Sequence, residues 1–171
     1  MKIIADRMTA ARAEGVVVFL IGMRVNRWWK IHRWLPVALA MPRMLRELRA
    51  KPDSGFLGAS LLPGLSVQYW ESLEALLAYA ADRSGQHFPA WADFYKRVGT
   101  SGDVGIWHET YVVPAGAFES VYVNVPPTGL GRYAPLVPAR GRLARARTRL
   151  TAGSSEATLP APNEAVTATG A

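Results

Sequence analysis

The spacing of apolar and polar residues predicts alternating strands and helices between residues 14 and 125. The near-continuous apolar run at 14–25 is rich in β-branched residues, which is typical of a strand buried on both faces. Helical spacing predicts helices over 33–50, from Ser72 to the break at Arg83-Ser84-Gly85, and over 87–98. Short strands are predicted at 56–64, 65–71, 104–113 and 117–125. Pro42 should kink the first helix or divide it.

This order of elements predicts an α+β fold. Strand, helix, strand, strand, helix pair, strand and strand follow one another as in the split βαβ arrangement of ferredoxin-like domains. The helices of such a domain cover one face of its sheet, and the other face must also be buried. A second copy of the chain is the simplest cover, so the pattern predicts a homodimer that forms a dimeric α+β barrel.

The last two predicted strands form a hairpin around the turn at 114–117. Side chains alternate along a strand, so Ile106 and His108 share one face while Trp107 and Glu109 share the other. A strand histidine that points into a domain is a candidate ligand or acid/base, with Glu109 beside it as a second catalytic candidate. The alternative for His108 is a hydrogen-bonded histidine of the core or its rim.

Two other groups could bind a ligand. His87, Trp91 and Phe94 fall on one face of the helix at 87–98, either as a ligand beside an aromatic-lined cavity or as a histidine over a core stripe. Arg24 and Arg27 close the strand at 14–25 and could pair with an anion such as a haem propionate, or lie at the surface. His32 precedes a helix and is interpreted as a surface or capping residue.

Length and composition predict one domain at 1–138 and a basic, then low-complexity, disordered tail at 139–171. The absence of cysteine excludes a disulfide framework, a thiolate haem ligand and an iron–sulfur cluster. Much of the formal charge of +7 comes from five arginines that follow Ala139. A basic run without a recognised motif does not indicate a nucleic-acid partner.

Nothing in the sequence indicates a signal peptide or a membrane partner. The apolar runs at 15–23 and 34–42 are shorter than the roughly 20 residues that span a bilayer. We therefore expect a cytoplasmic protein that acts on a small molecule.

The stretch from Trp107 to Leu130 resembles the C-terminal segment of haem-dependent aldoxime dehydratases. It is also similar to small monooxygenase-family proteins that share the dimeric α+β barrel. The shared features are a histidine before a glutamate, a hairpin, Tyr122-Val123-Asn124 and a Pro-Thr-Gly turn. The resemblance extends back through 69–98, where an acidic and aromatic helix precedes a histidine and a hydrophobic–aromatic run.

The resemblance implies a haem b cofactor with His87 as the proximal iron ligand, Trp91, Phe94, Arg24 and Arg27 around the cofactor, and His108 as the distal acid/base. The implied activity is dehydration of an oxime-like N–O compound. Full aldoxime dehydratases are longer and draw an Arg and a Ser from an N-terminal half that has no counterpart here. Two alternatives remain: a monooxygenase, with haem or without a cofactor, that acts on an aromatic substrate, and a haem-binding carrier.

Overall fold

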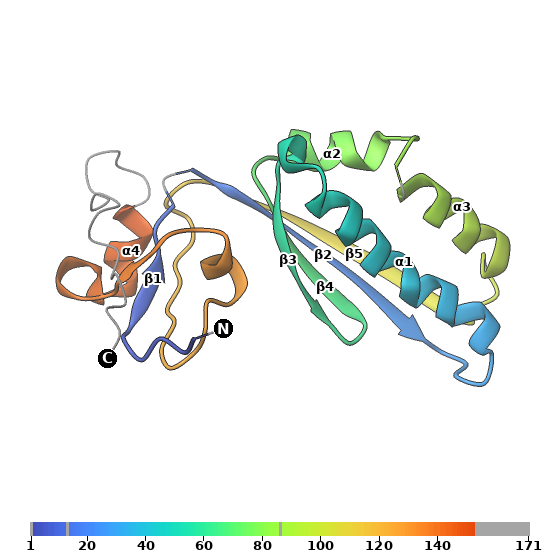
Figure 1. Ribbon diagram of the computed structural model, residues 1–171, viewed down its shortest axis with the longest axis horizontal. Coiled ribbons are helices and arrows are strands. Elements are labelled where there is room, and N and C mark those ends of the chain that lie inside the picture. Colours follow the sequence, from blue (N-terminus) through green and yellow to red (C-terminus); the bar gives the residue numbers. More distant parts are fainter. Residues whose placement is uncertain (1, 13, 86, 153–171) are drawn as a thin grey trace. The chain divides into compact units, whose positions relative to one another are not determined.

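The computed structural model describes residues 2–12, 14–85 and 87–152. These residues form two compact units (Figure 1). The larger unit is Val17–Val112, and the smaller one combines Met1–Val16 with the chain from Val113 onward. In the described part of the chain, no helix is both long and apolar enough to cross a membrane.

The larger unit is built on a four-stranded sheet in the order β3-β4-β2-β5. Its strands are β2 (Val16–Val25), β3 (Phe56–Leu62), β4 (Leu65–Trp70) and β5 (Val104–Val113). The antiparallel register pairs Leu20 of β2 with Val67 of β4. Helices α1 (Ile31–Arg49), α2 (Leu73–Ala81) and α3 (His87–Arg97) connect the strands, with the short 3-10 turn η1 (Pro52–Ser54) before β3. The ferredoxin-like α+β prediction is confirmed.

The core of this unit lies between α1, α2 and one face of the sheet. Leu45 and Leu48 of α1 pack with Val17 of β2 and Trp70 of β4, and each of these side chains is almost fully buried. Alternation along β2 therefore directs its odd-numbered residues toward the helices and its even-numbered residues toward the other face. Figure 1 shows α1 running along the sheet.

Two local predictions in this unit have different outcomes. Ser72 caps α2 as expected, because its hydroxyl accepts a hydrogen bond from the Ala75 backbone N–H at 3.1 Å. Pro42 does not divide the first helix, since α1 runs unbroken through both Pro36 and Pro42. Each proline removes one backbone donor, but packing of the apolar face keeps the helix in one piece.

The smaller unit contains β1 (Met8–Ala10) and β6 (Leu136–Pro138), which pair with each other. It also holds two 3-10 turns, η2 (Gly129–Arg132) and η3 (Gly141–Ala144), and helix α4 (Ala146–Ala152). Residues 141–144 and 146–152 of the predicted tail form η3 and α4, and residues 153–171 lie outside the described part of the chain. Arg149 is buried there and donates to the Glu119 carboxylate at 2.7 Å.

The predicted hairpin partner at 117–125 is wrong. The turn after β5 forms, with the Ala117 N–H bonded to the Pro114 carbonyl at 3.1 Å. The chain then makes only isolated bridges, pairing Tyr122 with Met8 and Val125 with Ile4. Asn124 has a positive φ of 55°, which interrupts an extended strand. The residues that bridge to Tyr122 and Val125 lie more than a hundred positions earlier in the sequence.

Candidate functional site

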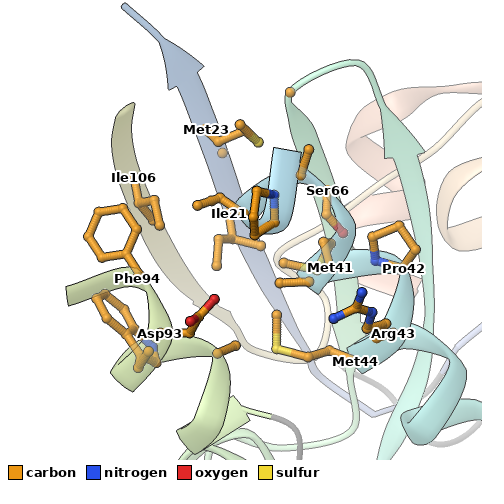
Figure 2. Close-up of a pocket in the computed structure, with 18 of the residues that line it drawn as sticks. Ile21, Met23, Met41, Pro42, Arg43, Met44, Ser66, Asp93, Phe94 and Ile106 are labelled. Atoms are coloured by element: carbon orange, nitrogen blue, oxygen red, sulfur yellow. The ribbon is translucent and has the colours of Figure 1, made fainter. Parts of the chain in front are cut away.

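A cavity of about 490 Å³ opens between α1, α3 and the helix-covered face of the sheet. Ile21 and Met23 of β2 and Ile106 of β5 contribute to its sheet side. Met41 and Met44 come from α1, and Trp91 and Phe94 come from α3. Figure 2 shows these elements surrounding the space.

The aromatic residues of α3 are held in a fixed arrangement. The rings of Trp91 and Phe94 meet edge to face with centroids 6.0 Å apart, and Tyr95 stacks on Trp91 at 5.6 Å. Such contacts restrict the rings and give the cavity a rigid aromatic wall. Trp91 and Phe94 both line the cavity, and their role in binding a cofactor stays a prediction.

The opposite wall is flexible by comparison. Met41 and Met44 are unbranched thioethers, which adapt to the shape of a ligand more readily than branched side chains. The Met41 sulfur also accepts a hydrogen bond from the Gln68 side-chain amide at 3.6 Å. One wall of the cavity is thus rigid and aromatic, and the other can adjust.

Four polar side chains line the cavity, those of Arg43, Ser66, Asp93 and Arg97. Asp93 of α3 and Arg43 of α1 lie on opposite walls (Figure 2). Asp93 also accepts a hydrogen bond from the Arg97 guanidinium at 2.6 Å, so its charge is already balanced. Ser66 of β4 is 1% exposed, and among the described residues its hydroxyl has no hydrogen-bond partner. A buried hydroxyl without a partner costs free energy, and a ligand atom beside Ser66 would remove that cost.

His108 borders the cavity without lining it. It shares a strand face with the lining residue Ile106, about 7 Å further along β5. Its ring lies 5.6 Å from that of Phe19, which packs against the core. The imidazole is exposed on that edge. A ligand that fills the cavity and extends along β5 would reach it.

Glu109 lies on the opposite face of the sheet, as the alternation predicted. Its carboxylate accepts a hydrogen bond from the Tyr111 hydroxyl at 2.6 Å, and this bond raises the pKa of Tyr111. On the same face, Trp107 covers Gly22 so closely that a Cβ at Gly22 would lie 2.4 Å from the indole. Glu109 and His108 therefore do not meet, although they are neighbours in sequence.

The structure separates Arg24 and Arg27 from the cavity. The Arg27 guanidinium donates to Asp103 at 2.8 Å, and Lys30 donates to the same carboxylate at 3.0 Å. Asp103 is 1% exposed, and its hydrogen bond with Lys30, followed by that with Arg27, lowers its pKa. Arg27 thus pairs with a protein carboxylate, while Arg24 is exposed near Gly105.

His87 is the first residue of α3, four positions before Trp91. Its side chain lies outside the described part of the structure, so its role as a ligand stays a prediction. Within the described residues, no group of three His, Asp or Glu side chains is arranged to hold a metal ion.

Several lining residues were not singled out in the sequence. Met41 and Met44 belong to the apolar stripe of α1, and the same spacing marks core residues, so no pattern separates the two. Ser66 lies between the apolar residues Leu65 and Val67 of β4. A polar residue on the inward face of a strand is the signal that could have identified Ser66 as a cavity residue.

The sheet and its covering helices define a ferredoxin-like α+β domain that contains a cavity between α1 and α3. A family model described as monooxygenase af470-like matches residues 16–130. The chain belongs to this family, and therefore to the dimeric α+β barrel superfamily. No curated protein matches the chain.

Solved structures match the chain at low sequence identity. The aldoxime dehydratase OxdRE, crystallised with butyraldoxime, matches with a TM-score of 0.61 and 18% identity over 76% of this chain. The chain spans 40% of that protein. A possible oxidoreductase of unknown function from Bacteroides thetaiotaomicron matches at a TM-score of 0.39 and 12% identity, over 57% of this chain and 97% of that one. The cofactor-independent oxygenase SnoaB from Streptomyces nogalater matches at a TM-score of 0.37 and 13% identity, over 63% of this chain and 92% of that one.

Proposed function

We propose that this chain is a haem-dependent enzyme that acts on a small substrate with an N–O bond, such as an aldoxime. The supporting observation is the apolar cavity between α1 and α3, together with His108 on the adjoining stretch of β5. The fold is similar to that of an aldoxime dehydratase, which agrees with this proposal. At 18% identity, this similarity concerns the fold alone. Family membership supports an enzyme of the monooxygenase-like type.

The residues around the cavity suit a haem group. The volume of about 490 Å³ lies in the usual range of ligand pockets, and Met41, Met44 and Phe94 supply apolar walls that would exclude water from a macrocycle. His87 is the proposed iron ligand, because it begins the helix that carries Trp91 and Phe94. Arg43 lines the cavity and is the candidate for pairing with a propionate, because Arg27 pairs with Asp103 and Arg97 with Asp93.

The proposed chemistry assigns one proton-transfer residue. When bound, haem iron supplies a site for the substrate nitrogen and the electrons that weaken its N–O bond. His108 holds a proton on a ring nitrogen and donates it to the hydroxyl oxygen, which leaves as water. The same imidazole then accepts the hydrogen of the aldoxime carbon as a proton, so the net change is loss of one water and formation of a nitrile.

Haemin titration with absorbance detection tests the proposal. We expect a saturable one-to-one Soret change that His87→Ala abolishes and that His108→Ala leaves intact. His32→Ala is the matched control, because His32 is exposed at the start of α1 and away from the cavity lining. No Soret change in the wild type, or an unaltered one in His87→Ala, would refute haem binding through this residue.

Turnover separates the enzyme from a haem carrier. With haem bound and reduced under anaerobic conditions, aldoxime conversion should be lost in His108→Ala and kept in His32→Ala. A carrier would give the Soret change without turnover, and His108→Ala would not alter its haem affinity.

The second candidate is a monooxygenase, which the family match favours, and we consider its cofactor-free form. The cavity would then hold the organic substrate itself, with the Ser66 hydroxyl bonded to a polar atom of that substrate. This candidate predicts oxygen uptake with an aromatic substrate by haem-free protein, and a raised KM in Ser66→Ala with little change in kcat. Oxygen uptake that requires added haemin would refute it.

We also infer that a second copy covers the open face of the sheet. Trp107 is 44% exposed and Tyr111 50% exposed there, beside Val18, Leu20 and Val67. Apolar residues on both faces of a sheet need cover on both sides. Light scattering on a sizing column should give a dimer, and Trp107→Glu should give a monomer with an unchanged circular dichroism spectrum. A monomeric wild type would contradict this inference.

A further inference from the structure

Two adjacent tryptophans project from the turn between β2 and α1. Trp28 is 66% exposed and Trp29 74% exposed. The turn is held in place, because the Trp34 indole N–H donates to the Trp28 carbonyl at 2.9 Å and the two rings meet edge to face at 5.6 Å. The exposed indoles are therefore displayed by an ordered turn.

The outer side of α1 continues this apolar surface. Ile31, Leu35 and Leu39 follow at intervals of four residues and are 54%, 40% and 44% exposed. Arg49, about five turns after Ile31, and Arg46 return to the same side of the helix, and both are exposed. We call this strip, with Trp28 and Trp29, the α1 outer surface.

The surroundings of this surface are basic. No acidic residue occurs between Glu14 and Glu47, a segment that contains six Lys or Arg residues. Asp103, which directly precedes β5, is buried against Arg27 and Lys30 and neutralises only part of that charge. The exposed apolar strip thus lies in a field that attracts anions.

We propose that the α1 outer surface docks on an anionic lipid membrane. Tryptophan favours the headgroup region, aliphatic side chains favour the acyl boundary, and arginines pair with lipid phosphates. Helix α1, lying flat with Ile31, Leu35 and Leu39 toward the lipid, presents all three at once. The short apolar runs that argued against a membrane partner concern spanning a bilayer and do not bear on a surface contact.

Two other occupants explain the surface less well. A symmetric contact with a second copy, with the two α1 helices antiparallel, would bring Arg46 and Arg49 to the turn that carries Arg27 and Lys30. Those two cations share the single carboxylate of Asp103, so like charges would still repel there. A nucleic acid would satisfy the basic residues and the indoles, but it offers no apolar phase for the aliphatic strip. An anionic lipid surface matches the indoles, the aliphatic side chains and the arginines together.

Docking would place the cavity beside the lipid. Pro36, Val37 and Met41, on another side of α1, line the cavity, so an apolar ligand dissolved in the membrane would pass only the edge of this helix. This proposal does not depend on haem binding or on the reaction type.

Vesicle sedimentation with the full chain tests the proposal. We expect binding to phosphatidylcholine vesicles that contain phosphatidylglycerol, little binding to phosphatidylcholine alone, and a loss of binding at high salt. Trp28→Ser/Trp29→Ser and, separately, Arg46→Gln/Arg49→Gln should each weaken binding by about tenfold or more. Circular dichroism checks that both variants fold as the wild type does.

The matched control is Arg145→Gln/Arg147→Gln, which removes the same charge from exposed positions of the smaller unit. It should bind vesicles like the wild type, and equal loss in this control would overturn the proposal in favour of a general charge effect. Tighter binding to a single-stranded oligonucleotide than to anionic vesicles would also overturn it. So would a tryptophan variant that changes the oligomeric state while vesicle binding stays the same.

Discussion

Trp70 offers the most direct test of how the larger unit is held together. Its side chain is fully buried, and its indole N–H donates to the Gln68 side-chain oxygen at 3.1 Å. Phe56 and Tyr79 pack on the ring with centroids at 5.1 and 5.6 Å. Trp70→Phe keeps one aromatic ring but removes the N–H and part of the apolar contact.

The expected loss has two parts. The missing ring atoms cost about 1–2 kcal/mol of apolar burial. Gln68 is also buried, and leaving its oxygen without a donor costs about 1–3 kcal/mol more. We therefore expect Trp70→Phe to lower the free energy of unfolding by about 3 kcal/mol, a large share of the roughly 5–15 kcal/mol typical of a domain.

A double-mutant cycle separates the two parts. Gln68→Met alone leaves the Trp70 N–H without its acceptor, whereas Trp70→Phe/Gln68→Met removes donor and acceptor together. The double variant should therefore be more stable than the sum of the single losses predicts, by about 1–3 kcal/mol. Urea unfolding followed by far-ultraviolet circular dichroism measures this, because Trp70 itself contributes to the fluorescence. Strictly additive losses would refute the role assigned to the hydrogen bond.

Three further predictions concern stability. Lys30 lowers the pKa of Asp103 in the folded protein. The ionised carboxylate therefore stabilises the fold above its unfolded pKa of about 4, and this stabilisation is lost as the pH falls through the lower folded pKa. Asp103→Asn should lower stability at pH 7 and flatten the decline of stability in acid; an unchanged acid profile would contradict this. Ser72→Ala should cost about 1 kcal/mol in urea unfolding through loss of the α2 cap, and Ser72→Asp should recover it. Leu48→Ala should cost about 3–5 kcal/mol in the same assay, and a loss below 1 kcal/mol would show that the core collapses around the gap.

The local sequence predicted most of the larger unit because its signals are local. The strand at β2 follows from a run of β-branched residues, and α1 and α2 follow from helical spacing and the Ser72 cap. The order of those elements was enough for the ferredoxin-like fold, since few topologies accommodate it. The opposite orientation of His108 and Glu109 needed only strand alternation.

Contacts between distant residues escaped prediction. Residues 117–125 pair singly with residues 4 and 8, and no nearby pattern encodes partners so far along the chain. Arg27 carries the charge expected of an anion site, but its partner is Asp103, which the fold brings to it from 76 positions away.

The sequence by itself determined the type and order of the elements, the lack of cysteine chemistry and the short list of histidines. Tertiary structure alone decided that Met41, Ser66 and Phe94 enclose one cavity, because each is an ordinary residue of a separate element until the helices pack on the sheet. Tertiary structure also decided that Ser66 is buried there without a hydrogen-bond partner among the described residues. Burial of a strand residue depends on which helices pack over the strand in the folded protein. Periodicity acts over a few residues, whereas a cavity is formed by surfaces that meet across the whole domain.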